Sequence, residues 1–154
     1  MAKLTPSGAR TYEGRRALVV EHDGETRSRY RTLLEGLGFQ VRSVERGAAA
    51  IEAAREVLPD VVLMDVQLSD VSGLEAARWL KSEPALRAIP VIASSTMIFA
   101  KGDRALAESG VNVLLRKPVP SQHLSRAIHD VLDGGEGMSE GAAPRRQPSK
   151  GQRG

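Results

Sequence analysis

The sequence predicts a doubly wound α/β domain, with one parallel five-stranded sheet between two layers of helices. Two observations support this prediction. Short apolar runs alternate along the chain with segments of helical periodicity. The runs also lack the polar alternation of half-exposed strands, so they are typical of strands covered on both faces. Alternating strands and helices indicate right-handed parallel βαβ units.

The first strand and helix follow a polar N-terminal segment. The apolar run 17–20 ends in the acidic stretch 21–24, and a helix that stops at Gly36 or Gly38 comes next. One face of this helix has apolar residues at helical spacing, namely Tyr30, Leu33, Leu34 and Leu37. Residues 39–44 are the second predicted strand.

The middle of the chain repeats this order. Residues 47–58 predict a helix closed by Pro59, and residues 60–65 predict a third strand that ends at Asp65. Ser72 is suited to cap a helix over residues 73–81.

The last elements have the same pattern. Residues 89–93 predict the fourth strand, which a polar turn at residues 94–96 follows. A short helix over 102–109 and a fifth strand over 111–115 come next. The last helix has one apolar stripe, formed by Leu124, Ala127, Ile128, Val131 and Leu132.

Length and charge predict one domain with polar ends. A chain of 154 residues has room for a single well-filled core. We expect an N-terminal extension over residues 1–15, the domain over 16–133 and a disordered basic tail over 134–154. Residues 1–16 carry +3 and 134–154 carry +2 of a total of +3, so the body carries −2. Basic tails more often indicate solvated ends than a nucleic-acid surface.

Composition excludes several other classes. The chain has no cysteine, which excludes disulfides, thiolate metal sites and thiol catalysis. It has no signal-type N-terminus and no apolar run of the roughly 20 residues that span a bilayer. We therefore expect a cytoplasmic protein.

The candidate site lies where the strands end. In an open α/β sheet the ligand crevice lies beyond the carboxyl ends of the strands, at the reversal of winding. That rule selects the polar residues Glu21, His22, Asp23, Asp65, Ser94, Ser95, Thr96 and Lys117. Carboxylates bind hard cations such as Mg²⁺, whereas a lysine and a hydroxyl neutralise and hydrogen-bond phosphoryl oxygens. This combination suits a phosphoryl group with a divalent cation.

The chain resembles the receiver domains of two-component response regulators, and it is most similar to the single-domain regulators of cell-cycle phosphorelays. The resemblance covers roughly residues 16–133, in family order and at family spacing. It rests on the segments Leu18-Val19-Val20-Glu21, Leu63-Met64-Asp65-Val66-Gln67-Leu68, Ser72-Gly73-Leu74-Glu75, Ile89-Pro90-Val91-Ile92-Ala93, Lys101-Gly102-Asp103 and Lys117-Pro118. It implies a flavodoxin-like sheet with strand order 2-1-3-4-5.

The resemblance also implies a role for each site residue. Asp65 would accept a phosphoryl group from the phosphohistidine of a histidine kinase or phosphotransfer protein. Glu21, Asp65 and the backbone carbonyl of Gln67 would hold Mg²⁺. Ser95 and Lys117 would bind the phosphoryl group. Such a protein positions and neutralises the reacting groups and is a signalling protein rather than an enzyme.

Two departures from the family pattern bear on function. His22 stands where the family has a second carboxylate, and imidazole suits Zn, Cu, Ni or Fe better than Mg. Three consequences are alternatives: weak Mg²⁺ binding, binding of another metal, or signalling without phosphorylation. A fourth reading is that His22 is a neutral residue with no special role. Asp23 is a candidate partial substitute as ligand. Leu114 stands at the position where many receiver domains have an aromatic switch residue. The usual coupling between the phosphoryl-binding hydroxyl and that aromatic ring is therefore in doubt.

The leading hypothesis is a stand-alone receiver that signals by protein–protein contact, since about twenty residues follow the last helix. A phosphorylation-independent pseudo-receiver, acting as a scaffold or dimerisation module, is the alternative. A flavodoxin-like cofactor binder is disfavoured because the acidic stretch 21–25 would repel a phosphate. Nucleic-acid binding through the tails lacks aromatic residues. A homodimer through the last helix follows from family behaviour alone.

Overall fold

The computed structural model describes residues 3–4 and 10–134. Apart from Gly134, the tail predicted to be disordered lies outside the described residues. The main sheet consists of β3 (Arg16–Val20), β4 (Gln40–Val44), β5 (Val61–Asp65), β6 (Val91–Ser95) and β7 (Val113–Arg116). The helices are α1 (Gly24–Gly36), α2 (Gly47–Val57), α3 (Gly73–Ser82), α4 (Arg104–Ser109) and α5 (Ser121–Leu132).

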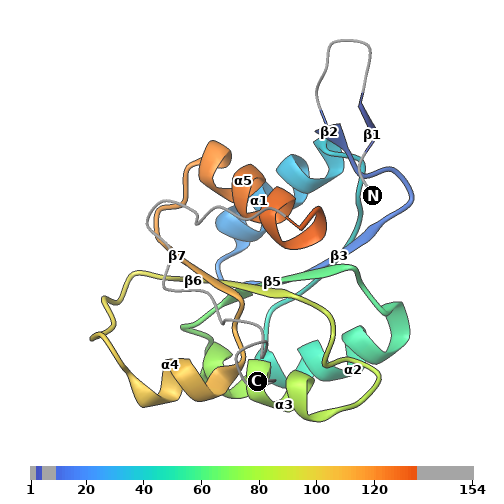
Figure 1. The fold of residues 1–154 in the computed structure, drawn as a ribbon. Coiled ribbons are helices and arrows are strands. Elements are labelled where there is room, and N and C mark those ends of the chain that lie inside the picture. The colour runs from blue at the N-terminus through green and yellow to red at the C-terminus, as the bar shows by residue number, and fades with distance from the viewer. Residues whose placement is uncertain (1–2, 5–9, 135–154) are drawn as a thin grey trace, which may run out of the picture.

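The five strands are parallel, and their order across the sheet is β4-β3-β5-β6-β7. This is the predicted order 2-1-3-4-5, so the predicted fold class is confirmed. Helices α1 and α5 cover one face of the sheet, and α2, α3 and α4 cover the other (Figure 1). The winding reverses between β3 and β5, which places the ligand crevice at the carboxyl ends of these two strands.

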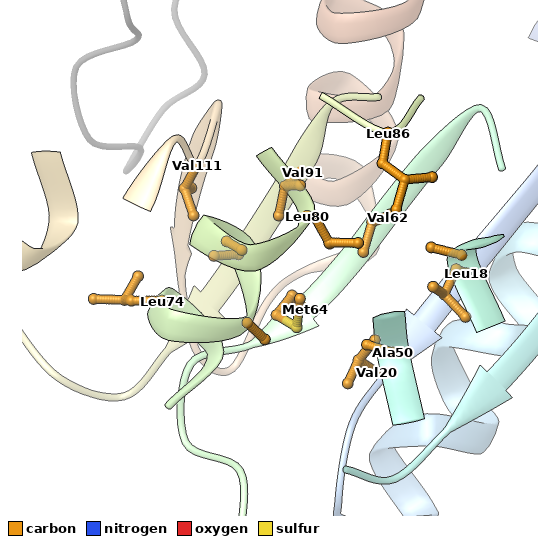
Figure 2. Close-up of a cluster of buried hydrophobic side chains, with 14 of the residues drawn as sticks. Leu18, Val20, Ala50, Val62, Met64, Leu74, Leu80, Leu86, Val91 and Val111 are labelled. Carbon is orange, nitrogen blue, oxygen red and sulfur yellow. The ribbon is translucent and has the colours of Figure 1, made fainter. Parts of the chain in front are cut away.

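Aliphatic side chains fill both faces of the sheet. The central strand β5 is buried along its whole length, as its continuous apolar run predicts. Figure 2 shows one of the two clusters, in which Val62 and Met64 of β5 pack with Leu74 and Leu80 of α3. The second cluster lies under α1 and α5 and contains Tyr30, Leu34 and Ile128. The sheet is therefore a rigid base for the polar residues at its edge.

The fourth strand differs in its limits from the prediction. The sequence predicted a strand over 89–93 and a turn from Ser94, whereas β6 begins at Val91 and continues through Ser95. Pro90 has no N–H to donate to the ladder, which accounts for the later start. Pairing with Asp65 on one side and with Leu115 on the other holds Ser94 in the sheet. The polar side chains of residues 94–96 predicted a turn, but pairing with the neighbouring strands keeps Ser94 in β6.

The segment before β3 contributes to the core. Two short strands, β1 (Lys3–Leu4) and β2 (Arg10–Thr11), pair antiparallel and form a separate two-stranded sheet. Tyr12 is buried and stacks on Phe39, with ring centroids 5.0 Å apart. Its hydroxyl donates a hydrogen bond of 3.2 Å to Asp133. Packing therefore begins upstream of residue 16, within the segment that the sequence analysis assigned to an extension.

Within the described residues, no helix combines the length and the apolar character needed to cross a bilayer.

Leu58 ends α2 in the left-handed conformation, with φ of 50° and ψ of 63°. This conformation is unfavourable for a residue with a Cβ, and the Leu58 side chain is 54% exposed, so it loses little packing when removed. We expect Leu58→Gly to raise the free energy of unfolding by about 0.5–1 kcal/mol in urea titrations. Leu58→Ala keeps the strained backbone and is expected to give no such gain. An equal gain in both variants would show that backbone strain is not the cause.

Candidate phosphorylation site

Four side chains from three strands meet at the carboxyl edge of the sheet. Asp65 ends β5, Glu21 and His22 follow β3, and Lys117 follows β7. Nζ of Lys117 lies 3.0 Å from Oε1 of Glu21 and 3.4 Å from Oδ2 of Asp65. Nδ1 of His22 lies 3.1 Å from the same Asp65 oxygen. The structure therefore brings together residues that are up to 96 positions apart in the sequence.

The carboxylates at this edge are deeply buried. Glu21 is 0% exposed and Asp65 is 1% exposed. Burial raises the pKa of Glu21, the charge of Asp65 raises it further, and the Lys117 ammonium opposes both effects. Burial alone would lower the pKa of Lys117, but Glu21 and Asp65 more than offset this and raise it. Two carboxylates face one ammonium, which leaves an excess of negative charge that suits a cation.

One group of possible metal ligands occurs among the described residues. It consists of Glu21, His22 and Asp65, whose ligand atoms all lie within 4.8 Å of one another. The two carboxylates supply the oxygen ligands that Mg²⁺ prefers, whereas the imidazole is better suited to softer metals. The donor set therefore fits a divalent cation, with one ligand that disfavours Mg²⁺.

Asp23 lies outside this group. Its carboxylate caps α1 and accepts hydrogen bonds from the backbone N–H of Thr26 at 2.9 Å and from the Thr26 hydroxyl at 2.7 Å. These bonds lower the pKa of Asp23, which is exposed. Asp23 thus has a helix-capping role here, and its use as a metal ligand would break the cap.

Ser95 lies at the rim of the site and joins two loops. Its hydroxyl accepts a hydrogen bond of 2.9 Å from the backbone N–H of Met97 and lies 3.5 Å from Oε1 of Gln67. The same Gln67 oxygen accepts hydrogen bonds from the N–H and the hydroxyl of Thr96, at 3.1 and 3.0 Å. Gln67 therefore connects the loop after β5 to the loop after β6. The family resemblance implied a role only for the backbone carbonyl of Gln67, and no pattern in the sequence indicates this role of the side chain.

Gly73 allows α3 to approach the site closely. Its backbone N–H donates a 2.7 Å hydrogen bond to the carbonyl of Val66. A Cβ at this position would lie 2.1 Å from the backbone oxygen of Asp65 and 2.8 Å from Cα of Val66. Only glycine fits this contact, which fixes the backbone of the candidate phosphoacceptor.

Arg27 supports the same region from α1. One guanidinium nitrogen donates a hydrogen bond of 2.9 Å to the backbone carbonyl of Glu21. The other lies 3.6 Å from Glu45. Arg27 was not among the site residues predicted from the sequence, because a bond from a side chain to a backbone carbonyl leaves no pattern in the sequence.

The loop after Ser95 is partly apolar and exposed. Met97 is 49% exposed and Ile98 is 73% exposed, whereas Phe99 packs against the core. Met97, Ile98 and Phe99 form an apolar trio in this loop. Two of its three members lie on the surface, beside the candidate site.

Comparison with known proteins identifies the class of protein. The model of the response regulator receiver domain matches residues 17–129. The chain belongs to this family of two-component signalling proteins. It is 34% identical over 115 residues to the polar-differentiation response regulator DivK of Brucella anthropi, which covers 75% of this chain and 94% of that protein. DivK of Brucella ovis has the same identity and coverage.

Solved structures agree with this assignment. The receiver domain of the sensor histidine kinase PA1611 from Pseudomonas aeruginosa has a TM-score of 0.71 and 28% identity, covering 78% of this chain and 98% of that one. That structure contains a magnesium ion in its active-site cleft. A CheY-like receiver domain from Methylobacillus flagellatus has a TM-score of 0.66 and 28% identity, covering 76% and 98%.

Proposed function

We propose that the protein is a single-domain response regulator that accepts a phosphoryl group on Asp65 and signals through protein–protein contacts. The observation that carries this proposal is the position of the Lys117 ammonium, 3.4 Å from Asp65 and 3.0 Å from Glu21. A cation held beside a buried carboxylate can neutralise charge that develops on a transferred phosphoryl group.

The proposed reaction is a phosphoryl transfer from a phosphohistidine. An Oδ atom of Asp65 attacks phosphorus, and the P–N bond to the donor imidazole breaks. The electron pair remains on the imidazole nitrogen, which takes a proton from solvent. Lys117 and the Ser95 hydroxyl bind the phosphoryl oxygens. For this role the Ser95 hydroxyl has to turn from Gln67 toward Asp65.

Mg²⁺ is the proposed cofactor, and its chemistry is to neutralise the anionic phosphoryl group. The residues that would hold it are Glu21, Asp65 and the backbone carbonyl of Gln67. His22 already contacts Asp65 at 3.1 Å, so its imidazole competes for the same oxygen. The site therefore suits Mg²⁺ less well than one with a carboxylate at position 22.

The partners are proposed from family membership. We propose that a histidine kinase or a histidine phosphotransfer protein supplies the phosphoryl group in the cytoplasm, with residues 16–133 as the receiver domain. A homodimer is a further proposal on the same basis.

Phosphorylation can be tested by intact mass. Incubation with Mg²⁺ and a small acyl phosphate is expected to add one phosphoryl mass to the wild type and none to Asp65→Asn. Asp70→Asn is the control, because Asp70 is an exposed carboxylate that binds the N–H groups of Gly47 and Ala48. An adduct that persists in Asp65→Asn would contradict the proposal.

His22→Asp is expected to strengthen Mg²⁺ binding by roughly tenfold or more, because it exchanges an imidazole for a hard oxygen ligand and adds one negative charge. Calorimetric Mg²⁺ titration measures the change. His123→Asp, on α5, adds the same charge outside this ligand group and is expected to leave the affinity near that of the wild type. Unchanged affinity in His22→Asp would show that position 22 does not contact the metal.

The alternative is a pseudo-receiver that acts without phosphorylation as a scaffold or dimerisation module. It is favoured by His22 in contact with Asp65 and by aliphatic Leu114 at the position of the aromatic switch. It predicts no phosphoryl adduct in the wild type, and partner binding that Asp65→Asn leaves unchanged.

A further inference from the structure

Two buried hydroxyl groups beside the site have no hydrogen-bond partner. Among the described residues, the side-chain polar atoms in this condition are the hydroxyl oxygens of Tyr30 and Ser94. Tyr30 is 3% exposed and Ser94 is 2% exposed. A buried polar group without a partner is unfavourable, and such groups are rare in native proteins. Their presence together requires an explanation.

The pairing of the strands places Ser94 beneath the side chain of Lys117. Asp65, Ser94 and Leu115 are register partners in adjacent strands, so their side chains point to the same face of the sheet. Lys117 starts beyond the end of β7 and reaches Asp65 on β5. Because β6 lies between β5 and β7, the lysine side chain crosses the end of β6 on the face of Ser94.

The Tyr30 side chain extends from α1 toward the region of Ser94 and Lys117. Its ring belongs to the hydrophobic cluster under α1 and α5 that also contains Leu115. The guanidinium of Arg29 lies 5.4 Å from the ring centroid. Burial raises the pKa of the Tyr30 phenol, and the Ser94 hydroxyl and the Lys117 ammonium oppose that rise. The Ser94 hydroxyl therefore lies beside the phenol and the charge of Lys117 acts on it, although the phenol has no partner in hydrogen-bond geometry.

The ammonium of Lys117 has three N–H donors. In this structure Nζ of Lys117 donates hydrogen bonds to both oxygens of the Glu21 carboxylate and also contacts the carboxylate of Asp65. We expect a phosphoryl group on Asp65 to draw the ammonium toward the new oxygens and away from Glu21, because those oxygens carry additional negative charge. The donors released in this way need acceptors within reach of the lysine, and hydroxyl oxygens can accept them without adding charge.

We propose that Tyr30 and Ser94 are positioning residues whose hydroxyls accept hydrogen bonds from Lys117 when Asp65 carries a phosphoryl group. This inference rests on the proposed function and adds two residues to the site. It assigns to α1 a contact that forms only in the phosphorylated state. It also gives both hydroxyls a hydrogen-bond partner in that state.

Binding of beryllofluoride, a phosphoryl mimic, tests the proposal in the presence of Mg²⁺. Tyr30→Phe and Ser94→Ala are each expected to weaken binding by roughly tenfold, since each loses one hydrogen bond to a charged group. Ser94→Thr restores the hydroxyl and is expected to bind nearly as well as the wild type. Tyr30→Phe is also expected to raise the thermal midpoint of the free protein, because it removes an unpaired buried hydroxyl.

Tyr12→Phe is the matched control, since Tyr12 is the other tyrosine and is also buried. Its hydroxyl is bonded to Asp133, so its removal is expected to lower the thermal midpoint and leave beryllofluoride affinity unchanged. In protein labelled with fluorotyrosine, the ¹⁹F signal of Tyr30 is expected to shift on addition of beryllofluoride and that of Tyr12 to stay. A shift of this kind reports a new contact, which a purely structural role would not produce.

The outcomes separate this inference from the proposed function. If the wild type binds beryllofluoride and takes up a phosphoryl mass but Tyr30→Phe and Ser94→Ala bind as tightly as the wild type, the inference alone is overturned. Weaker binding that follows a loss of thermal stability, with no shift of the Tyr30 signal, also overturns it. If the wild type neither binds beryllofluoride nor gains mass, the proposed function and the inference fail together.

Discussion

Lys117→Met is expected to lower the free energy of unfolding by about 3 kcal/mol at neutral pH. The substitution keeps most of the apolar stem and removes the charge. It leaves Glu21, which is 0% exposed, beside Asp65 without the ammonium that now binds both. Removing one partner of a buried ion pair is strongly destabilising, because the remaining charge stays buried. Urea unfolding at pH 7 measures the loss.

The pH dependence of this loss has a defined sign. The pKa of Glu21 is raised in the folded protein above its ordinary value of 4.5, and removal of Lys117 raises it further. A group with a raised folded pKa binds its proton more tightly when folded, so its stabilising contribution is complete below the unfolded pKa and is lost as the pH rises through the folded pKa. The deficit of Lys117→Met is therefore expected to be small below about pH 4.5 and to grow toward pH 7.

Glu21→Gln combined with Lys117→Met is the control for this prediction. The double variant has no carboxylate at position 21 and is expected to recover much of the stability that Lys117→Met loses. If both variants lose the same free energy of unfolding, or if the loss does not change with pH, the Glu21 charge is not the cause of the loss.

Gly73→Ala is expected to lower the free energy of unfolding by about 3 kcal/mol, because overpacking of this kind forces the backbone to shift. The added Cβ would lie 2.1 Å from the backbone oxygen of Asp65. The strand β5 cannot move aside freely, since it pairs with β3 and β6 along its length. Phosphorylation of Asp65 is expected to slow by about 100-fold, since a displacement of about 1 Å at a reacting group has an effect of that size.

Gly36→Ala provides a matched comparison. Gly36 is the last residue of α1, and a Cβ there would meet nothing within 4 Å. This variant is expected to be as stable as the wild type or more stable by up to about 1 kcal/mol, because alanine is the better helix former, and to be phosphorylated at the wild-type rate. Wild-type stability and rate in Gly73→Ala would contradict the close approach of α3 to Asp65.

The fold was predictable because its signals are local and repeated. Four apolar runs and the segment 39–44 each mark a strand, and their parallel orientation follows from the alternation with helices. The strand order 2-1-3-4-5 was implied by the family resemblance. The capping role of Ser72 was also predictable, and the structure has its hydroxyl accepting a 3.1 Å hydrogen bond from Leu74. The limits of β6 were not predictable, because pairing with Asp65 and Leu115 overrides the polarity of Ser94.

Part of the site was predictable for the same reason. The rule for strand ends selects Glu21, Asp65 and Lys117, since the carboxyl ends of parallel strands meet at one edge. The contacts of the Gln67 side chain, Arg27 and Tyr30 were not predictable. Each depends on a side chain that reaches another element, and no spacing in the sequence encodes that reach. The close approach at Gly73 is of the same kind.

The central claim is that Asp65, among several carboxylates at this edge, carries the phosphoryl group. Borohydride reduction of the phosphorylated protein converts an aspartyl phosphate to homoserine, which peptide mass spectrometry locates. We expect homoserine at position 65 alone. Homoserine at position 23 or 70, or full phosphorylation of the wild type without homoserine at position 65, would contradict this account.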